Sequence, residues 1–381
     1  MKSQGILLGK ILNIPVNVDY SWFLIFILLT WSLAISYYPS EFRQWPTAWY
    51  WIMGAITAIM LFVSVLLHEL GHSIVALRYK IPVRNITLFI FGGVAQISSE
   101  PPTAMSEFWI AIAGPVVSFL LAGIFGLLEL IVSTLTPLFA LMKYLAYING
   151  TLGLFNLIPG FPLDGGRVFR AIIWGTSGDY RKATRIAAGV GRAIAYIFIL
   201  VGVYFIFSGN FSGGIWIAFI GWFLESAARS QAQQMAVRDL LAGRKVYQAM
   251  SQNYTIISPT ITLQRLADTH ILGEGRRFFI VQDETSVRGV LTLQTIREIP
   301  RDQWLNMTAE QAMIRAGDMK WVRPESELWD ALERMDQNGV NQLPVIQDDQ
   351  IAGLLTRENV ISFLRTLQEF KSRPWPDASN R

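Results

Sequence analysis

Long apolar stretches separated by short polar segments dominate the first 230 residues of the chain. About 20 consecutive apolar residues are needed to cross the hydrocarbon core of a bilayer. Six stretches approach or exceed that length, at residues 21–38, 50–75, 108–133, 138–160, 186–207 and 213–228. This pattern predicts a polytopic α-helical membrane protein with about six transmembrane helices.

A different pattern lies between the second and third stretches. Residues 83–97 are rich in β-branched and aromatic side chains, and the segment is too short for another span. It predicts a small membrane-associated β-hairpin that turns at Gly92–Gly93. A plain connecting loop is the alternative.

The composition becomes that of a soluble protein after Arg229, and this region contains an internal repeat. Phe279–Asp283 followed by Gly289–Thr292 has the same pattern as Leu343–Asp348 followed by Gly353–Thr356, about 64 residues later. The repeat predicts a soluble α/β domain with two β-α-β-β-α halves. The expected divisions of the chain are a membrane domain at 1–230, a linker at 231–246, a soluble domain at 247–370 with repeats at about 247–305 and 310–370, and a flexible tail at 371–381.

Residue counts narrow the possible chemistry. The chain has no cysteine, which excludes disulfides and thiolate metal sites. Its histidines are His68, His72 and His270, so a histidine-bound metal must use the first two together with a carboxylate. The net charge of +4 comes mostly from basic residues beside the apolar stretches, and we therefore expect no nucleic-acid partner.

The positions of the basic residues predict how the chain is oriented. They gather before the first stretch, after the second, and between the fourth and fifth, at Lys2, Lys10, Arg78, Lys80, Arg84, Arg167, Arg170, Arg181, Lys182 and Arg185. Because cytoplasmic loops are enriched in Lys and Arg, both termini and the soluble domain should be cytoplasmic. The expected location is the cell (inner or plasma) membrane.

The sequence His-Glu-Leu-Gly-His at residues 68–72 lies inside the second apolar stretch. On a helix, two histidines four residues apart share one face and can bind Zn²⁺, with the glutamate available as general base. Polar groups at membrane depth are costly, which favours a functional role. The alternative is a helix end in the headgroup layer. His68 follows Trp51 by roughly 25 Å of helix, which would put it in the cytoplasmic third of the bilayer.

Asp164 is the candidate for the third protein ligand that a hydrolytic zinc site needs. It lies in the sequence NLIPGFPLDGGR, residues 156–167, where the prolines break helical hydrogen bonding. Irregular backbone at membrane depth is tolerated where it is buried in protein or lines a wet cavity. Taken alone, the segment could instead be an interfacial turn in which Asp164 caps the next helix.

These motifs resemble those of the site-2 protease family of intramembrane zinc metalloproteases. The resemblance rests on HExxH in one span and Asn156–Arg167 in a later one, and it extends to Ile14–Trp22 and Ala113–Pro115. It covers residues 5–230. One departure is Asp19, where family members often have a histidine.

The resemblance implies one Zn²⁺ per chain, bound by His68, His72 and Asp164. It further implies that Glu69 is the catalytic base that deprotonates the bound water. The implied activity is hydrolysis of a peptide bond in or near a transmembrane segment, as in regulated intramembrane proteolysis. The implied partners are the lipid bilayer and a single-span membrane protein, such as an anti-sigma factor or a pro-protein.

Three further residues are implicated through the same resemblance. Asn156 matches a family asparagine thought to hold the substrate backbone or to stabilise the oxyanion, although a purely local structural role is the alternative. Gly92 and Gly93 would belong to a β-element that presents the substrate as an extended strand. Two other functions stay open: a transporter or channel that uses the buried His, Glu and Asp as an ion path, and a metal-binding scaffold without activity.

The soluble repeats resemble a tandem CBS (Bateman) domain, which marks one subgroup of these proteases. In CBS repeats that bind adenine nucleotides, a Gly-h-h-Thr/Ser-x-x-Asp/Asn motif contacts phosphate and ribose. Gly353–Asn359 fits, which implicates Thr356 and Asn359 in binding ATP, ADP or AMP, whereas the first repeat departs at Thr295. The implied roles are regulation of the protease and homodimer formation. A scaffold or lid without a ligand is the alternative.

Overall fold

The computed structural model describes residues 5–132, 136–283, 286–348 and 350–372. Its contacts divide the chain into two compact units, Met1–Met235 and Ala236–Arg381. From residue 373 onward, the tail that we expected to be flexible lies outside the described residues. Within the expected linker, residues 231–241 are helical.

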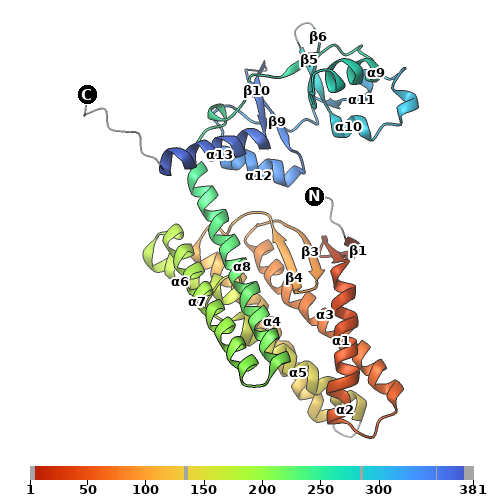
Figure 1. The fold of residues 1–381 in the computed structure, drawn as a ribbon, viewed down its shortest axis with the longest axis vertical. Helices are drawn as coiled ribbons and strands as arrows, with labels where there is room; N and C mark the ends of the chain where they lie inside the picture. The colour runs from red at the N-terminus through yellow and green to blue at the C-terminus, as the bar shows by residue number, and fades with distance from the viewer. Residues whose placement is uncertain (1–4, 133–135, 284–285, 349, 373–381) are drawn as a thin grey trace, which may run out of the picture. The chain divides into compact units, whose positions relative to one another are not determined.

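Helices make up most of the first unit (Figure 1). α1 (Ser21–Ser32) continues through a π-helical segment (Leu33–Tyr37) into α2 (Tyr38–Glu41). The later helices are α3 (Thr47–Arg78), α4 (Ala104–Ile131), α5 (Thr136–Asn156), α6 (Asp164–Ser177), α7 (Tyr180–Phe207) and α8 (Phe211–Leu241). Six stretches of the described residues, the combined Ser21–Glu41 and every later helix except α6, are long and apolar enough to cross a membrane. The prediction of a six-span membrane protein is confirmed.

Local sequence explains where several of these helices begin and end. Thr103 and Ser106 form a capping box at the start of α4, in which each side chain accepts from the other's backbone N–H. α5 ends at Asn156, earlier than the span predicted to residue 160, because Pro159 has no N–H to donate. α6 ends at Ser177 and is capped by Gly178, whose φ of +69° is left-handed.

A four-stranded sheet lies at one end of α1 and α3 (Figure 1). Its order is β1 (Gly5–Ile11), β2 (Ile14–Asp19), β3 (Val83–Phe89), β4 (Gly92–Ile97). β2 and β3 are parallel, and the other two pairs are antiparallel. The predicted hairpin is therefore β3–β4, but it is part of a larger sheet.

The prediction that this hairpin turns at Gly92–Gly93 is wrong. Phe89 pairs with Gly92, so the turn is Ile90–Phe91 and the glycines begin β4. Phe91 at the turn stacks on Phe223 of α8 with ring centroids 4.3 Å apart, a contact that favours this register. α3 packs against β3 and β4 as well as against α1, α4 and α5, which places the sheet beside the HExxH helix.

The second unit contains two α/β halves. The first has β5 (Thr255–Ile257), α9 (Leu263–Leu266), a π-helical segment (Ala267–Leu272), β6 (Phe278–Asp283), β7 (Ser286–Thr292), α10 (Leu293–Arg297), α11 (Ala309–Ala312) and β8 (Ile314–Arg315). The second has α12 (Leu328–Asn338), β9 (Gln342–Gln347), β10 (Gln350–Thr356) and α13 (Arg357–Ser372). Short 3₁₀ turns lie at Val246–Gln248 and Arg301–Gln303. Val322 forms only a bridge to Val345 where the repeat predicts a first strand.

Candidate metal centre

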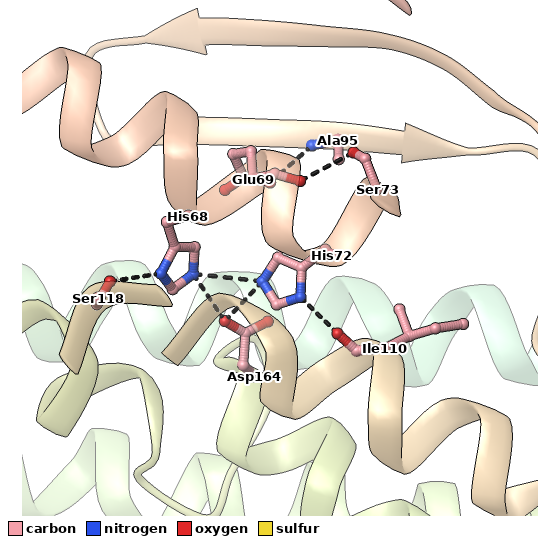
Figure 2. A network of polar contacts seen from close by, with 8 residues as sticks. All are labelled: His68, Glu69, His72, Ser73, Ala95, Ile110, Ser118 and Asp164. Atoms are coloured by element: carbon pink, nitrogen blue, oxygen red, sulfur yellow. Dashed lines mark hydrogen bonds and ion pairs between the residues drawn. The ribbon is translucent and has the colours of Figure 1, made fainter. Parts of the chain in front are cut away.

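The two histidines of the HExxH sequence lie on one face of α3, one turn apart. Both are buried, each 4% exposed. Their Nε2 atoms are 3.3 Å from each other. Figure 2 shows both rings pointing away from α3 toward Asp164. The four-residue spacing predicted from sequence therefore brings two imidazole nitrogens together at one point.

Asp164 is the first residue of α6. Its Oδ2 atom lies 3.1 Å from the Nε2 of His68 and 3.1 Å from the Nε2 of His72. These three donor atoms all lie within 4.8 Å of one another. Asp164 is more than ninety positions from each histidine in the sequence. The broken segment after α5 is what returns the chain to α3 at this point.

The outer ring nitrogens of both histidines are held by α4 (Figure 2). His72 Nδ1 is 2.7 Å from the carbonyl oxygen of Ile110, which can only accept, so this nitrogen carries the proton. In the neutral ring, Nε2 then has a free lone pair that faces Asp164. His68 Nδ1 is 2.8 Å from the hydroxyl of Ser118, which can donate or accept. Such outer hydrogen bonds fix the orientation and tautomer of metal-binding histidines.

The donor set fits a zinc ion. Zinc ligands at about 2.0 Å in a tetrahedral arrangement are about 3.3 Å apart. The three separations here, 3.3, 3.1 and 3.1 Å, are close to that value. Two imidazole lone pairs and a carboxylate are also ligand types that Zn²⁺ prefers, and three protein ligands leave one position for water.

Gly114 allows α4 to pass close to this centre. A Cβ atom at Gly114 would lie 2.2 Å from His72 Nε2 and 2.6 Å from His68 Nε2. Real side chains do not approach this closely, so any larger residue would displace α4 or the imidazoles. Glycine at this position therefore keeps the space between the two rings open.

Glu69 points toward β4 instead of toward the three donor atoms (Figure 2). Its Oε2 accepts a hydrogen bond of 3.0 Å from the backbone N–H of Ala95. A Cβ atom at Gly93 would lie 2.6 Å from Glu69 Cγ. The carboxylate thus lies between the HExxH helix and the backbone of β4, in the turn of α3 that also carries His68 and His72.

The other residues predicted from the sequence belong to α5, to β4 and to the second unit. Asn156 is the last residue of α5 and is partly buried. Gly92, with φ +126°, begins β4 beside Gly93. In the second unit, Thr356 lies at the junction of β10 and α13. Asn359 Oδ1 accepts hydrogen bonds from the backbone N–H and the hydroxyl of Thr356, at 3.1 and 2.7 Å, so these two side chains contact each other.

Sequence reasoning did not identify the groups that hold the imidazoles. Ser118 is a polar residue within an apolar helix, four positions after Gly114, and that spacing was an available signal. The Ile110 carbonyl leaves no signal, because every residue supplies one. The Ala95 N–H cannot be predicted from the sequence either, since its contact with Glu69 depends on the register of β4.

The family model for Peptidase family M50 matches residues 56–137 and 129–200, and the CBS domain model matches residues 309–366. The first match includes both histidines and Asp164, and the second includes Thr356 and Asn359.

Curated relatives match most of the chain. A protein of Synechocystis sp., named zinc metalloprotease sll0528, is 36% identical over 96% of this chain and 96% of its own length. Zinc metalloprotease Rip3 of Mycobacterium tuberculosis is 35% identical over 94% of this chain and 92% of its own length. Among solved structures, the site-2 protease from Methanocaldococcus jannaschii is 34% identical with a TM-score of 0.42, covering 60% of this chain and 94% of that one.

Proposed function

Because the chain belongs to peptidase family M50, the site-2 proteases, we propose that His68, His72 and Asp164 hold its zinc ion and that Glu69 is its catalytic base. The protein is a multi-pass membrane zinc metalloprotease that carries a CBS region. The convergence of three metal-binding atoms within 4.8 Å is the observation that carries the proposal. We expect one zinc ion per chain.

The proposed reaction is hydrolysis of a peptide bond. When bound, zinc acts as a Lewis acid that polarises water and the scissile carbonyl, which permits hydrolysis near neutral pH. Glu69 takes a proton from the attacking water as the new C–O bond forms, and it passes that proton to the amine as the C–N bond breaks. The Ile110 carbonyl and the Ser118 hydroxyl keep the two imidazoles in orientation throughout.

Asn156 is proposed to bind the substrate. Its position at the end of α5, just before the broken segment that leads to Asp164, supports this role. Its side-chain amide could donate to the substrate backbone or to the carbonyl oxygen as negative charge develops there. Donors of this kind are worth about 2.7–4 kcal/mol of transition-state stabilisation.

β4 is proposed to hold the substrate as an extended strand. It is an edge strand of its sheet, and Gly92 and Gly93 begin it. Because hydrogen-bonded and non-hydrogen-bonded pairs alternate in an antiparallel hairpin, Gly93 and Ala95 direct their backbone groups away from β3. The Ala95 N–H donates to Glu69, so the groups proposed for the substrate are the Gly93 N–H and the carbonyls of both residues. A substrate strand can add to such an edge through main-chain hydrogen bonds. An extended strand also exposes a peptide bond that a helix would shield.

The proposed substrate is a single-span membrane protein such as an anti-sigma factor or a pro-protein. The distribution of Lys and Arg supports cytoplasmic termini, a cytoplasmic CBS region and a cell-membrane location. With that orientation, α3 carries the HExxH residues near the cytoplasmic side. Cleavage would therefore occur near the cytoplasmic end of the substrate's transmembrane segment.

Zinc content and cleavage of Asp164→Ala test the metal site. The wild-type protein, purified in detergent, should contain about one zinc per chain and cleave a single-span substrate until a chelator is added. Asp164→Ala should lose both zinc and cleavage. Asp179→Ala, which removes the carboxylate that caps α7, is the matched control and should keep both. Full zinc content in Asp164→Ala would contradict the proposed ligand set.

The CBS region is proposed to regulate the protease, with an adenine nucleotide bound at Thr356 and Asn359. α8 supports a route for this regulation. Its Phe223 stacks on Phe91 at the tip of the β3–β4 hairpin, within the first unit. Its Leu241 is fully buried in a core cluster of the second unit. A nucleotide that changes the packing of the second unit could therefore act on the substrate strand through one helix.

Calorimetric titration with AMP, ADP and ATP tests nucleotide binding by the full-length protein. Thr356→Val should weaken binding. Thr292→Val is the matched control, because Thr292 has the equivalent position in the first half, where Thr295 departs from the motif. Phe223→Ala should keep the nucleotide affinity but lose the effect of nucleotide on cleavage. If the wild-type protein binds none of the three nucleotides, this part of the proposal is wrong. Light scattering of the same samples would test the proposed CBS-mediated homodimer.

A further inference from the structure

A buried ion pair that the reaction above does not use joins α4 to α6. Glu107 on α4 is fully buried, and Arg170 on α6 is 8% exposed. The Nε and one terminal nitrogen of Arg170 each donate a hydrogen bond to Glu107 Oε1, and the bond from Nε is 2.7 Å long. An ion pair this deeply buried within a membrane unit carries a large desolvation cost.

Arg170 also contacts the segments that precede and follow α6. Its guanidinium lies over the ring of Phe161, 4.9 Å from the centroid, and over the ring of Tyr180, 4.8 Å from the centroid. Phe161 belongs to the broken segment that precedes Asp164, and Tyr180 begins α7. One side chain therefore contacts α4, the segment before α6 and the helix after it.

The pair is not arranged for maximal stability. Glu107 Oε1 accepts both hydrogen bonds, while Glu107 Oε2 is buried with no hydrogen-bond partner among the described residues. Replacing a buried ion pair by well-packed apolar side chains is often neutral or stabilising. The arrangement therefore points to a role beyond stability for this pair.

The location of the pair indicates that role. α4 holds His72 through Ile110 and His68 through Ser118, and Glu107 lies one turn before Ile110 on the same helix. α6 begins with Asp164 and carries Arg170 fewer than two turns later. The ion pair thus ties the helix that bears the carboxylate to the helix that orients both imidazoles.

We propose that Glu107 and Arg170 are positioning residues, which fix α6 against α4 so that the Asp164 carboxylate meets the two imidazole nitrogens. The inference rests on the proposed role of Asp164 as a metal ligand. Neither residue is assigned a contact with the substrate. They act by limiting the movement of α6, because a shift of this helix would change the separation of Asp164 Oδ2 from the two imidazole nitrogens.

Zinc affinity, measured by competition with a chelator in detergent, tests the proposal with Glu107→Gln. This variant keeps the size of the side chain and removes its charge. Partners that orient metal ligands typically contribute 10–100-fold in affinity or activity, and we expect a loss of about tenfold or more. At saturating zinc, kcat should fall while KM changes little. With Co²⁺ as a probe, the visible absorption should change, because it depends on coordination geometry.

Glu41→Gln is the matched control. Glu41 pairs with Lys143 at 2.7 Å in the same unit, but both side chains are exposed. Figure 1 shows α2, which ends at Glu41, at the opposite end of α1 from the four-stranded sheet. The zinc affinity, kcat and Co²⁺ spectrum of this variant should equal those of the wild type. Arg170→Lys is the second test variant, which keeps a cation opposite Glu107 and loses the planar fork, and it decides the matter if Glu107→Gln does not fold. We expect it to bind zinc less tightly than the wild type.

A lower melting temperature with wild-type zinc affinity, kcat and Co²⁺ spectrum in the folded variants would overturn the proposal, because the pair would then be purely structural. Failure of the proposed function is distinguishable from this result. It would appear as zinc retained by Asp164→Ala, which removes the premise, whereas loss of zinc in Asp164→Ala with unchanged Glu107→Gln refutes only the positioning role.

Discussion

The outer nitrogens of His68 and His72 are held by two different kinds of group. The His72 N–H donates to a main-chain carbonyl, which no substitution at Ile110 removes. His68 depends on one hydroxyl, that of Ser118. The two proposed ligands therefore differ in how far a single mutation can disturb them, and His68 is the more vulnerable.

Ser118→Ala should lower zinc affinity by about 10–100-fold, because the His68 ring loses the partner that orients it. The measurement is competition between the protein and a chelator of known affinity. Ser208→Ala is the control, since the Ser208 hydroxyl is exposed and donates to the Tyr204 carbonyl of the preceding turn. Unchanged affinity in Ser118→Ala would mean that packing alone orients His68.

Gly114→Ala should abolish zinc binding, because its methyl group would lie 2.2 Å from His72 Nε2. Overpacking of this kind also costs about 1–3 kcal/mol of stability. Gly123→Ala on the same helix is the control, since a Cβ there meets nothing within 4 Å. Zinc content per chain measured by elemental analysis distinguishes the two variants. Equal zinc in both would contradict the geometry of the centre.

At the element scale, β4 is the strand on which the proposed catalytic and substrate roles meet. Its Ala95 N–H donates to the Glu69 carboxylate, and its outer edge is the proposed substrate site. Neighbouring backbone groups of one strand therefore contact the proposed base and would contact the substrate. Small changes in this strand should affect turnover without affecting the metal.

Gly93→Ala should reduce kcat while zinc content stays at the wild-type level, because its Cβ would lie 2.6 Å from Glu69 Cγ and displace the base. Gly189→Ala is the control, since a Cβ at that position in α7 meets nothing within 4 Å. Steady-state cleavage and zinc analysis of the same preparations provide the test. Loss of zinc together with activity would mean that β4 supports the metal ligands as well.

Sequence patterns predicted the elements whose signals are local. An apolar stretch of about 20 residues has few alternatives to a membrane helix, so the six spans could be predicted. β1 could not, because Ile6, Leu7 and Leu8 are consecutive exposed apolar residues without the alternation of a strand. Its sheet forms only when β2 pairs with β3, which is remote in sequence. The predicted position of the hairpin turn was wrong because the contact between Phe91 and Phe223 outweighs the turn preference of the two glycines.

The candidate site also has residues that the sequence predicts and others that it does not. Histidine spacing and the Asp164 segment are visible in sequence, and the fold brings these three side chains together. The groups around them depend on tertiary structure. Glu107 and Arg170 read in sequence as ordinary charges beside apolar stretches, and only the packing of α4 on α6 makes them a buried pair.

At the scale of the whole molecule, orientation in the membrane decides where cleavage occurs. The absence of cysteine from the chain makes each introduced cysteine unique, so a membrane-impermeant maleimide can report its side. Ser208→Cys, between α7 and α8, should react in intact cells. Ser177→Cys, beside the basic residues between α6 and α7, should react only after permeabilisation. The opposite pattern would invert the topology and move the proposed cleavage to the other side.

The division of roles within HExxH is tested most directly by Glu69→Gln, with zinc content and cleavage measured on one preparation. Glutamine keeps the size of the side chain but cannot accept the proton. We predict about one zinc per chain, as in the wild type, and a cleavage rate lower by about 10²- to 10⁴-fold, the typical contribution of a general base. Cleavage at the wild-type rate would contradict the account.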